Sequence, residues 1–159
     1  MPVLIGQPAP AFSLYDTEKR LVTLEEHKGK TVLLLFFPLA FSSVCTKELC
    51  AVRDDISVYN EANATVFGIS VDSFYVLKKF KEDQGLNFGL LSDFNKDASK
   101  AYDVLYESFG NLGMKGVSKR AAFVVDGGGI VRYAEICPSP ADLPDFNKIQ
   151  AVLRNGRMQ

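Results

Sequence analysis

The segment from Pro38 to Cys45 holds the residues whose types and spacing point most directly to chemistry. The hydroxyl of Ser42 stands three residues before Cys45, and a proline stands seven residues before it. The segment follows the apolar, β-favouring run 31–37 and precedes a helical pattern, so we expect Cys45 at the start of a helix. Unpaired backbone N–H groups and the macrodipole at such an end favour an anionic sulfur. The segment therefore predicts a nucleophilic cysteine.

Strands and helices alternate around this segment. The pattern predicts an N-terminal hairpin from 12–14 and 21–24. Further strands are predicted at 31–37, 64–71, 88–91, 121–125 and 130–136. Helices are predicted after Ser42 or Ser43, after Asp72 or Ser73, at 98–102 and after Pro144. The glycines at 127–129 join two strands and lack the lysine and hydroxyl of a phosphate loop, which favours a hairpin turn. This order indicates an α/β fold in three layers, with a central mixed sheet flanked by helices.

The predicted helix after Ser42 or Ser43 carries the candidate nucleophile. Apolar side chains recur at helical spacing along it, and Cys45 extends their stripe backwards by one turn. The stripe consists of Leu49, Val52, Ile56 and Tyr59. We therefore expect one continuous helix, capped by a serine hydroxyl, with the Cys45 sulfur on its covered side.

Length, charge and cysteine usage restrict the class of protein. The 159 residues fit one domain spanning 1–159, and a net charge of −1 gives no electrostatic footprint for nucleic acid. The longest apolar run, 32–41, is too short to cross a bilayer, and no signal peptide is readable. Three dispersed cysteines and one histidine show no metal-ligand spacing. We expect a cytoplasmic protein without membrane, nucleic acid, metal or cofactor, in a compartment where cysteines serve redox catalysis.

The pattern Pro-x-x-x-Thr/Ser-x-x-Cys, met here from Pro38 to Cys45, resembles the active-site signature of the peroxiredoxins. The N-terminal residues 6–12 are similar to that family's Gly-x-x-Ala-Pro-x-Phe. The stretches 90–93 and 132–135 look most like its one-cysteine, E-type alkyl hydroperoxide reductase branch. The resemblance covers essentially the whole chain. It implies a thioredoxin fold with an N-terminal β-hairpin extension and a thiol-dependent peroxidase that needs no cofactor.

The resemblance also implies a role for each residue of the site. Cys45 would be the peroxidatic nucleophile, and Arg120, just before an apolar strand that ends in aspartate, would stabilise the thiolate and the transition state. Ser42 would hydrogen-bond the peroxide, and Pro38 would shield the pocket. Glu48, one helical turn beyond the cysteine, is a candidate to fix the arginine through a bidentate pair.

The partner that resolves an oxidised Cys45 stays open at this stage. Cys50 is the first candidate, because a cysteine five positions on resolves the bacterioferritin-comigratory branch. In an intact helix, residues i and i+5 have Cα atoms roughly 8–9 Å apart, beyond the ~7 Å limit for a disulfide, so the first turns would have to unwind. Cys137 is the second candidate, although it follows a sheet strand directly. The third is an external thiol, which the E-type resemblance favours.

Other functions compete with peroxide turnover. A thioredoxin-like disulfide reductase normally uses Cys-x-x-Cys, which this chain lacks. A redox sensor or holdase would share the first oxidation and then stop. The expected partners of a peroxidase are a peroxide substrate, a reductant of the thioredoxin, glutaredoxin or low-molecular-weight thiol type, and a second copy of the chain. The homodimer is expected beside the active-site loop, where Phe41, Tyr106 and Phe109 are either core residues or part of an association surface.

Overall fold

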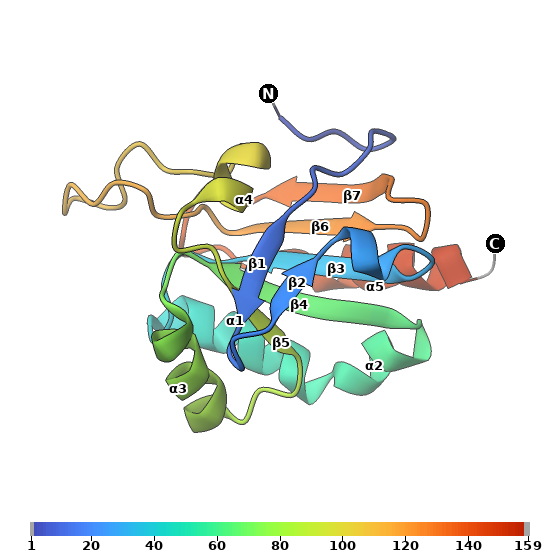
Figure 1. Cartoon of the computed structure of the whole chain (residues 1–159), viewed down its shortest axis with the longest axis horizontal. Helices are drawn as coiled ribbons and strands as arrows, with labels where there is room; N and C mark the ends of the chain where they lie inside the picture. The colour runs from blue at the N-terminus through green and yellow to red at the C-terminus, as the bar shows by residue number, and fades with distance from the viewer. Residues whose placement is uncertain (1, 158–159) are drawn as a thin grey trace.

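The computed structural model describes residues 2–157 and contains a seven-stranded mixed sheet in the order β2-β1-β5-β4-β3-β6-β7 (Figure 1). Strand β3 pairs in parallel with β4, and β4 with β5, while β6, β7, β1 and β2 add antiparallel partners at the two sides. The elements in chain order are β1 (Ser13–Asp16), β2 (Leu21–Thr23), the 3-10 helix η1 (Glu25–His27), β3 (Thr31–Phe36), α1 (Ser43–Asp54), α2 (Ile56–Glu61), β4 (Ala64–Ser70), α3 (Phe74–Gln84), β5 (Gly89–Ser92), α4 (Asp97–Ala101), β6 (Ala121–Val125), β7 (Val131–Ile136) and α5 (Phe146–Arg157).

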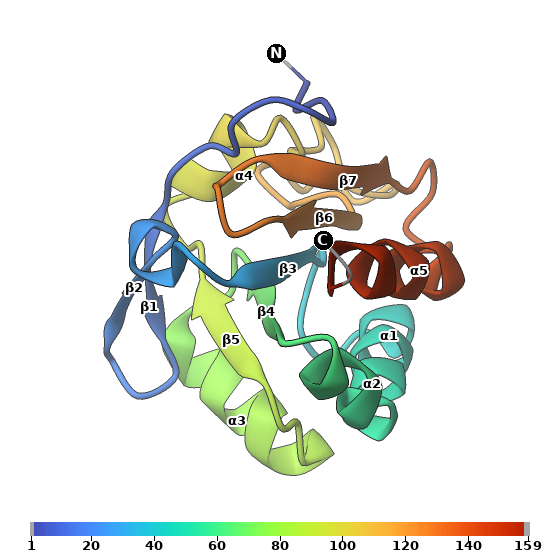
Figure 2. The same ribbon diagram turned by 90° about the vertical axis from the view of Figure 1, so that its right-hand side faces the viewer.

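Two apolar cores lie on the two faces of the sheet. Strand β3 is buried from Val32 to Phe36, and its side chains alternate between the two cores, as expected of a central strand. One core takes side chains from α1, α2, α3 and α5, and the other takes them from β1, β2 and α4. Figure 2 shows α1, α2 and α5 on one side of β3 and β6, with α4 on the other. The predicted three-layer α/β architecture is confirmed.

Most of the predicted elements are present, with ends shifted by a few residues. The N-terminal hairpin forms between β1 and β2, and the glycines at 127–129 make the turn between β6 and β7. That turn is closed by Asp126, whose Oδ1 accepts the N–H groups of Gly128 and Ile130. Helix α3 begins where Ser73 accepts the Val76 N–H, and it ends at the left-handed Gly85, as predicted.

The prediction of one continuous helix after Ser42 is wrong, because the helix is interrupted at Asp55. The backbone leaves the helical region there, with ψ at 18°, and α2 starts one residue later. The apolar stripe survives the interruption, since Leu49, Val52 and Tyr59 are all buried in the same core. The apolar stripe predicted the covered face of the helices correctly, but it gave no sign of the break at Asp55.

The chain places its candidate chemistry at one edge of the sheet. The carboxyl ends of the parallel strands β3, β4 and β5 lie together, and the segment 37–42 leaves the sheet from that edge to enter α1. Ligand sites in open α/β sheets lie outside the carboxyl ends of the strands. Within residues 2–157, no helix is long and apolar enough to cross a membrane.

Candidate active site

Ser42 occupies the position that caps α1, but its hydroxyl does not cap the helix. The Oγ atom donates to the carbonyl oxygen of Leu39 at 2.8 Å, and no backbone N–H of α1 bonds to it. The prediction that a serine hydroxyl caps the helix is therefore wrong. The backbone carbonyl of Ser42 starts the helix instead by accepting the Thr46 N–H at 3.0 Å. The N–H groups of the first turn consequently have no side-chain partner, which keeps the positive end of the dipole available.

Cys45 lies in the first turn of α1 with no exposed surface, on the covered face that the sequence predicted. Its sulfur accepts a hydrogen bond from Nη1 of Arg120 at 3.3 Å. A buried sulfur loses the solvation that would stabilise its anion, so a charged donor at contact distance decides whether the thiolate can form. The structure supplies that donor from a residue 75 positions away in sequence.

Arg120 is almost fully buried at the start of β6, and its guanidinium is held at three points. Nη1 also donates to Oε1 of Glu48 at 2.7 Å, and Nη2 donates to the carbonyl oxygen of Pro140 at 2.9 Å. Burial lowers the pKa of Arg120, but the neighbouring Glu48 and Cys45 outweigh it, so this pKa lies above its ordinary value. The guanidinium therefore keeps its charge at the sulfur.

Glu48 contacts Arg120 as the sequence predicted, but through one oxygen only. Its Oε2 has no hydrogen-bond partner in the described structure, so the predicted bidentate pair is not formed. Burial raises the pKa of Glu48 to about 7, while the charge of Arg120 and its hydrogen bond act in the opposite direction. A fully buried carboxyl with one unpaired oxygen is expected to hold its proton more tightly than an exposed one. Glu48 therefore changes its charge near neutral pH.

A shallow pocket of about 220 Å³ opens beside these groups. Arg120 both lines the pocket and donates to the Cys45 sulfur, so a small ligand in the pocket would contact the group that bonds the sulfur. The lining residues are Pro38, Ser42, Ser43, Val44, Phe109, Arg120, Pro140 and Ala141. Pro38 and Ser42 were predicted to lie here. Phe109 and Pro140 were missed as site residues, because they come from loops whose path the sequence pattern does not reveal.

The other two cysteines lie in different surroundings, and all three are free thiols. Cys50 is half-buried on α1, and its sulfur lies 3.5 Å from Oε1 of Gln84. Cys137 is buried just after β7, where its N–H donates to the carbonyl oxygen of Arg120. Burial first, and then the charges of Glu135 and Glu48, raise the pKa of the Cys137 thiol to about 11. Cys137 is therefore protonated at neutral pH.

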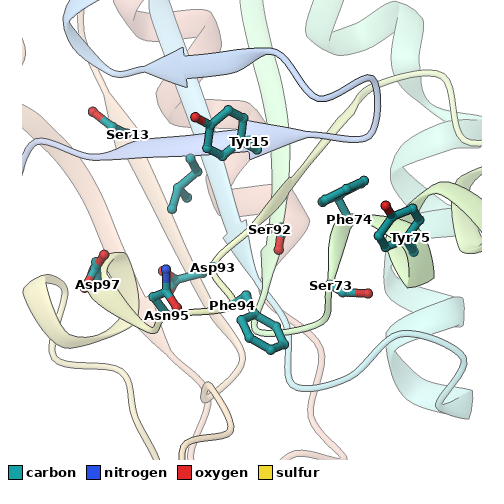
Figure 3. Close-up of a pocket in the computed structure, with 11 residues that line it drawn as sticks. Ser13, Tyr15, Ser73, Phe74, Tyr75, Ser92, Asp93, Phe94, Asn95 and Asp97 are labelled. Atoms are coloured by element: carbon teal, nitrogen blue, oxygen red, sulfur yellow. The ribbon is translucent and has the colours of Figure 1, made fainter.

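A second and larger pocket, of about 340 Å³, shares no lining residue with the first. Figure 3 shows the aromatic rings around it: Tyr15 from β1, Phe74 and Tyr75 from the start of α3, and Phe94 from the loop after β5. Tyr15, Tyr75 and Phe94 are more than half exposed. We call these four residues the aromatic patch. Within residues 2–157, no three His, Cys, Asp or Glu side chains gather in a way that would hold a metal ion.

Comparison with known proteins identifies the family. The model of the AhpC/TSA family matches residues 5–134, which include Cys45 and Arg120. Alkyl hydroperoxide reductase E of Mycobacterium bovis is 38% identical over 144 residues, covering 89% of this chain and 90% of that protein. The mitochondrial thioredoxin-dependent peroxide reductase of Drosophila melanogaster is 36% identical over 162 residues, covering 96% of this chain and 65% of that protein.

The fold agrees with a solved structure of the same kind. The crystal structure of peroxidoxin BcpB from Mycobacterium tuberculosis superposes with a TM-score of 0.84 at 29% identity, covering 96% of this chain and 97% of that one. The expected thioredoxin-like peroxiredoxin fold and the implied thiol peroxidase activity are confirmed together. The chain belongs to the AhpC/TSA family of peroxiredoxins, enzymes that reduce peroxides with a cysteine thiol.

Proposed function

We propose that Cys45 is the peroxidatic cysteine of this thiol peroxidase. The thiolate attacks one oxygen of the O–O bond, the S–O bond forms as the O–O bond breaks, and the electron pair leaves with the second oxygen as hydroxide or alkoxide. A proton then completes water or an alcohol, and Cys45 is left as a sulfenic acid. The hydrogen bond from Arg120 Nη1 to the sulfur is the observation that carries this proposal.

The neighbours of Cys45 divide the remaining tasks. Arg120 stabilises the anionic sulfur and then the charge that develops on the peroxide oxygens. Ser42 hydrogen-bonds the peroxide, and Pro38 forms an apolar wall that limits access of water. Glu48 holds the guanidinium in place through the 2.7 Å contact. Each role is supported by the position of the side chain beside the pocket or the sulfur.

Single-cysteine variants test the assignment. Cys45→Ser should remove peroxide consumption, because the sulfur that attacks the O–O bond is then absent. Cys50→Ser and Cys137→Ser should both keep the first oxidation, measured as one equivalent of hydrogen peroxide consumed by the reduced protein. Single-turnover activity in Cys45→Ser would refute the assignment. Repeated turnover with an added dithiol separates a peroxidase from a redox sensor, which oxidises once and stops.

For regeneration we propose that the Cys50 thiol condenses with the sulfenic acid, forming a Cys45–Cys50 disulfide and releasing water. Its partial exposure supports this choice, whereas the raised pKa of Cys137 disfavours that thiol as a nucleophile. An external thiol is the alternative. The disulfide would be returned to two thiols by a reductant of the thioredoxin, glutaredoxin or low-molecular-weight thiol class. The name of the Drosophila relative supports the thioredoxin class.

We propose further that the chain acts as one domain over 1–159 and forms a homodimer beside the active-site loop. The exposed rings of the aromatic patch support the dimer, as does Phe41 of the loop, which is half exposed. Tyr106 and Phe109, which were expected to be core residues or part of an association surface, are both half-buried, and Phe109 lines the pocket. Three free thiols support a reducing compartment such as the cytoplasm.

A further inference from the structure

The loop that joins β3 to α1 holds a strained backbone conformation. Phe41 has a φ of 68°, in the left-handed region that residues other than glycine occupy only with backbone strain. Its ring packs edge-on against Phe80 of α3 at 5.1 Å, but it is half exposed. Strained residues persist only where the surroundings fix them. Something besides the ring must therefore hold this loop.

The carboxyl group of Asp72 supplies that hold from the end of β4. Its Oδ2 accepts the N–H of Ala40 at 2.8 Å and the hydroxyl of Ser70 at 2.7 Å. The backbone of Asp72 is fixed as well: its N–H donates to Ser70 Oγ, and its carbonyl oxygen accepts the Ser92 hydroxyl at 2.7 Å. Figure 3 shows the two residues that flank it: Ser92 on β5, whose hydroxyl Asp72 accepts, and Ser73 at the start of α3, which follows Asp72 in the chain.

One peptide unit connects Asp72 to the active site. The N–H of Ala40 and the carbonyl of Leu39 belong to the same planar group, so fixing one fixes the other. That carbonyl accepts the hydroxyl hydrogen of Ser42 at 2.8 Å. We infer that Asp72 is a positioning residue of the peroxidase site, because it sets the peptide plane that orients the Ser42 hydroxyl. The inference rests on the proposed function of Cys45.

The orientation matters because a serine hydroxyl has one hydrogen to donate. With that hydrogen committed to Leu39, the Ser42 oxygen is left to accept a hydrogen bond from the O–H of a peroxide in the pocket it lines. If the peptide plane turned, the hydroxyl would lose its acceptor and rotate. The site would then lose a fixed acceptor for substrate while keeping the contact between Arg120 and Cys45.

Two reaction rates of Cys45, with peroxide and with an alkylating agent, show whether Asp72 positions Ser42 or merely stabilises the fold. Asp72→Ala should lower the second-order rate constant for oxidation of Cys45 by hydrogen peroxide roughly tenfold, the loss expected for one hydrogen bond made in the transition state. The rate of Cys45 alkylation by iodoacetamide should stay within about twofold, because it depends on the sulfur and Arg120. Asp72→Asn, which keeps an acceptor oxygen at the same reach, should restore the peroxide rate.

A double-mutant cycle shows whether Asp72 acts through the hydroxyl. Asp72→Ala combined with Ser42→Ala should be no slower toward peroxide than Ser42→Ala alone. Asp126→Ala is the matched control, because it also removes a carboxyl that accepts backbone N–H groups in a turn, and it should leave both rates unchanged. Should Asp72→Ala not fold, Ser70→Ala tests the same oxygen and should lower the peroxide rate about threefold.

Unchanged peroxide rates in both Asp72→Ala and Ser70→Ala would overturn the inference. It would also be overturned if Asp72→Ala lowered the peroxide rate by the same factor in the Ser42→Ala background as in the wild type. An equal loss in the peroxide and alkylation rates would overturn it as well, since that marks a disturbed sulfur. None of these results affects the assignment of Cys45. That assignment fails separately, if Cys45→Ser still consumes one equivalent of peroxide.

Discussion

At the scale of single residues, one guanidinium nitrogen is shared by two acid groups. Nη1 of Arg120 donates both to the Cys45 sulfur and to Oε1 of Glu48. If both partners were ionised, two anions would face one cation at a site whose three side chains are all buried, which is costly. The raised pKa of Glu48 relieves this conflict, because a protonated carboxyl leaves the charge of Arg120 to the thiolate. A protonated Glu48 thus stays hydrogen-bonded to Arg120 without competing for its charge.

The same shift predicts how stability depends on pH. The folded protein binds a proton at Glu48 up to a pKa of about 7, whereas the unfolded chain releases it near 4.5. Stability from this group is therefore fully present below about 4.5 and is lost as the pH rises through about 7. Between about pH 4.5 and pH 7 the free energy of unfolding should fall by roughly 3 kcal/mol more in the wild type than in Glu48→Gln. Urea titrations at several pH values measure this free energy for both proteins.

An exposed glutamate serves as the control for the buried Glu48. Glu61→Gln, at an exposed position on α2, should show the pH profile of the wild type. Parallel profiles for the wild type and Glu48→Gln would mean that Glu48 titrates alike in the folded and unfolded states. They would thereby contradict the raised pKa.

At the scale of elements, the proposed Cys45–Cys50 disulfide makes a demand on α1. In the reduced state its first turns bury Cys45 and Leu49 completely. A disulfide with Cys50 requires those turns to unwind, which exposes apolar surface at a cost of about 1.5–3 kcal/mol for each large side chain. The contacts of Arg120 with Cys45 and Glu48 oppose this unwinding. Cys50 is held more weakly, because within residues 2–157 its sulfur has one hydrogen-bond partner, Oε1 of Gln84 at 3.5 Å.

We therefore predict that one equivalent of peroxide removes about two turns of helix, roughly seven residues, from the far-ultraviolet circular dichroism spectrum. The loss should be absent in Cys50→Ser and retained in Cys137→Ser. Peptide mass mapping should find a peptide pair joined through Cys45 and Cys50. A stable sulfenic acid with a free Cys50 thiol would instead assign resolution to an external thiol.

The elements also show what the sequence could and could not predict. The buried strand β3, the covered face of α1 and the hairpin turn after Val125 follow from local pattern and turn chemistry, and all were predicted. The break at Asp55 was missed, because no proline or glycine marks it. The reach of Asp72 to Ala40 across 32 positions was also missed. Such contacts depend on where loops meet after folding, which periodicity does not report.

At the scale of the whole molecule, the topology explains why the site needs distant segments. Arg120 precedes β6, which is antiparallel to β3, so the start of β6 meets the end of β3 where α1 begins. Strand β4 is parallel to β3, so Asp72 reaches the same edge. The proposed nucleophile Cys45, Arg120 and Asp72 are thus brought together by one sheet. Residues far apart in sequence therefore meet only when the sheet has formed.

The aromatic patch gives the last prediction, which concerns association. Tyr75 and Phe94 expose 66% and 62% of their surface, and such clustered rings mark interfaces more often than free surface. We expect sedimentation at micromolar concentration to give twice the 17.5 kDa of one chain. A Tyr75→Asp and Phe94→Asp double variant should sediment as a monomer, because burying two charges without partners outweighs the apolar gain. Leu112→Asp, at a residue that is 76% exposed and outside the patch, should stay dimeric. A monomer mass for the wild type in both redox states would contradict the dimer.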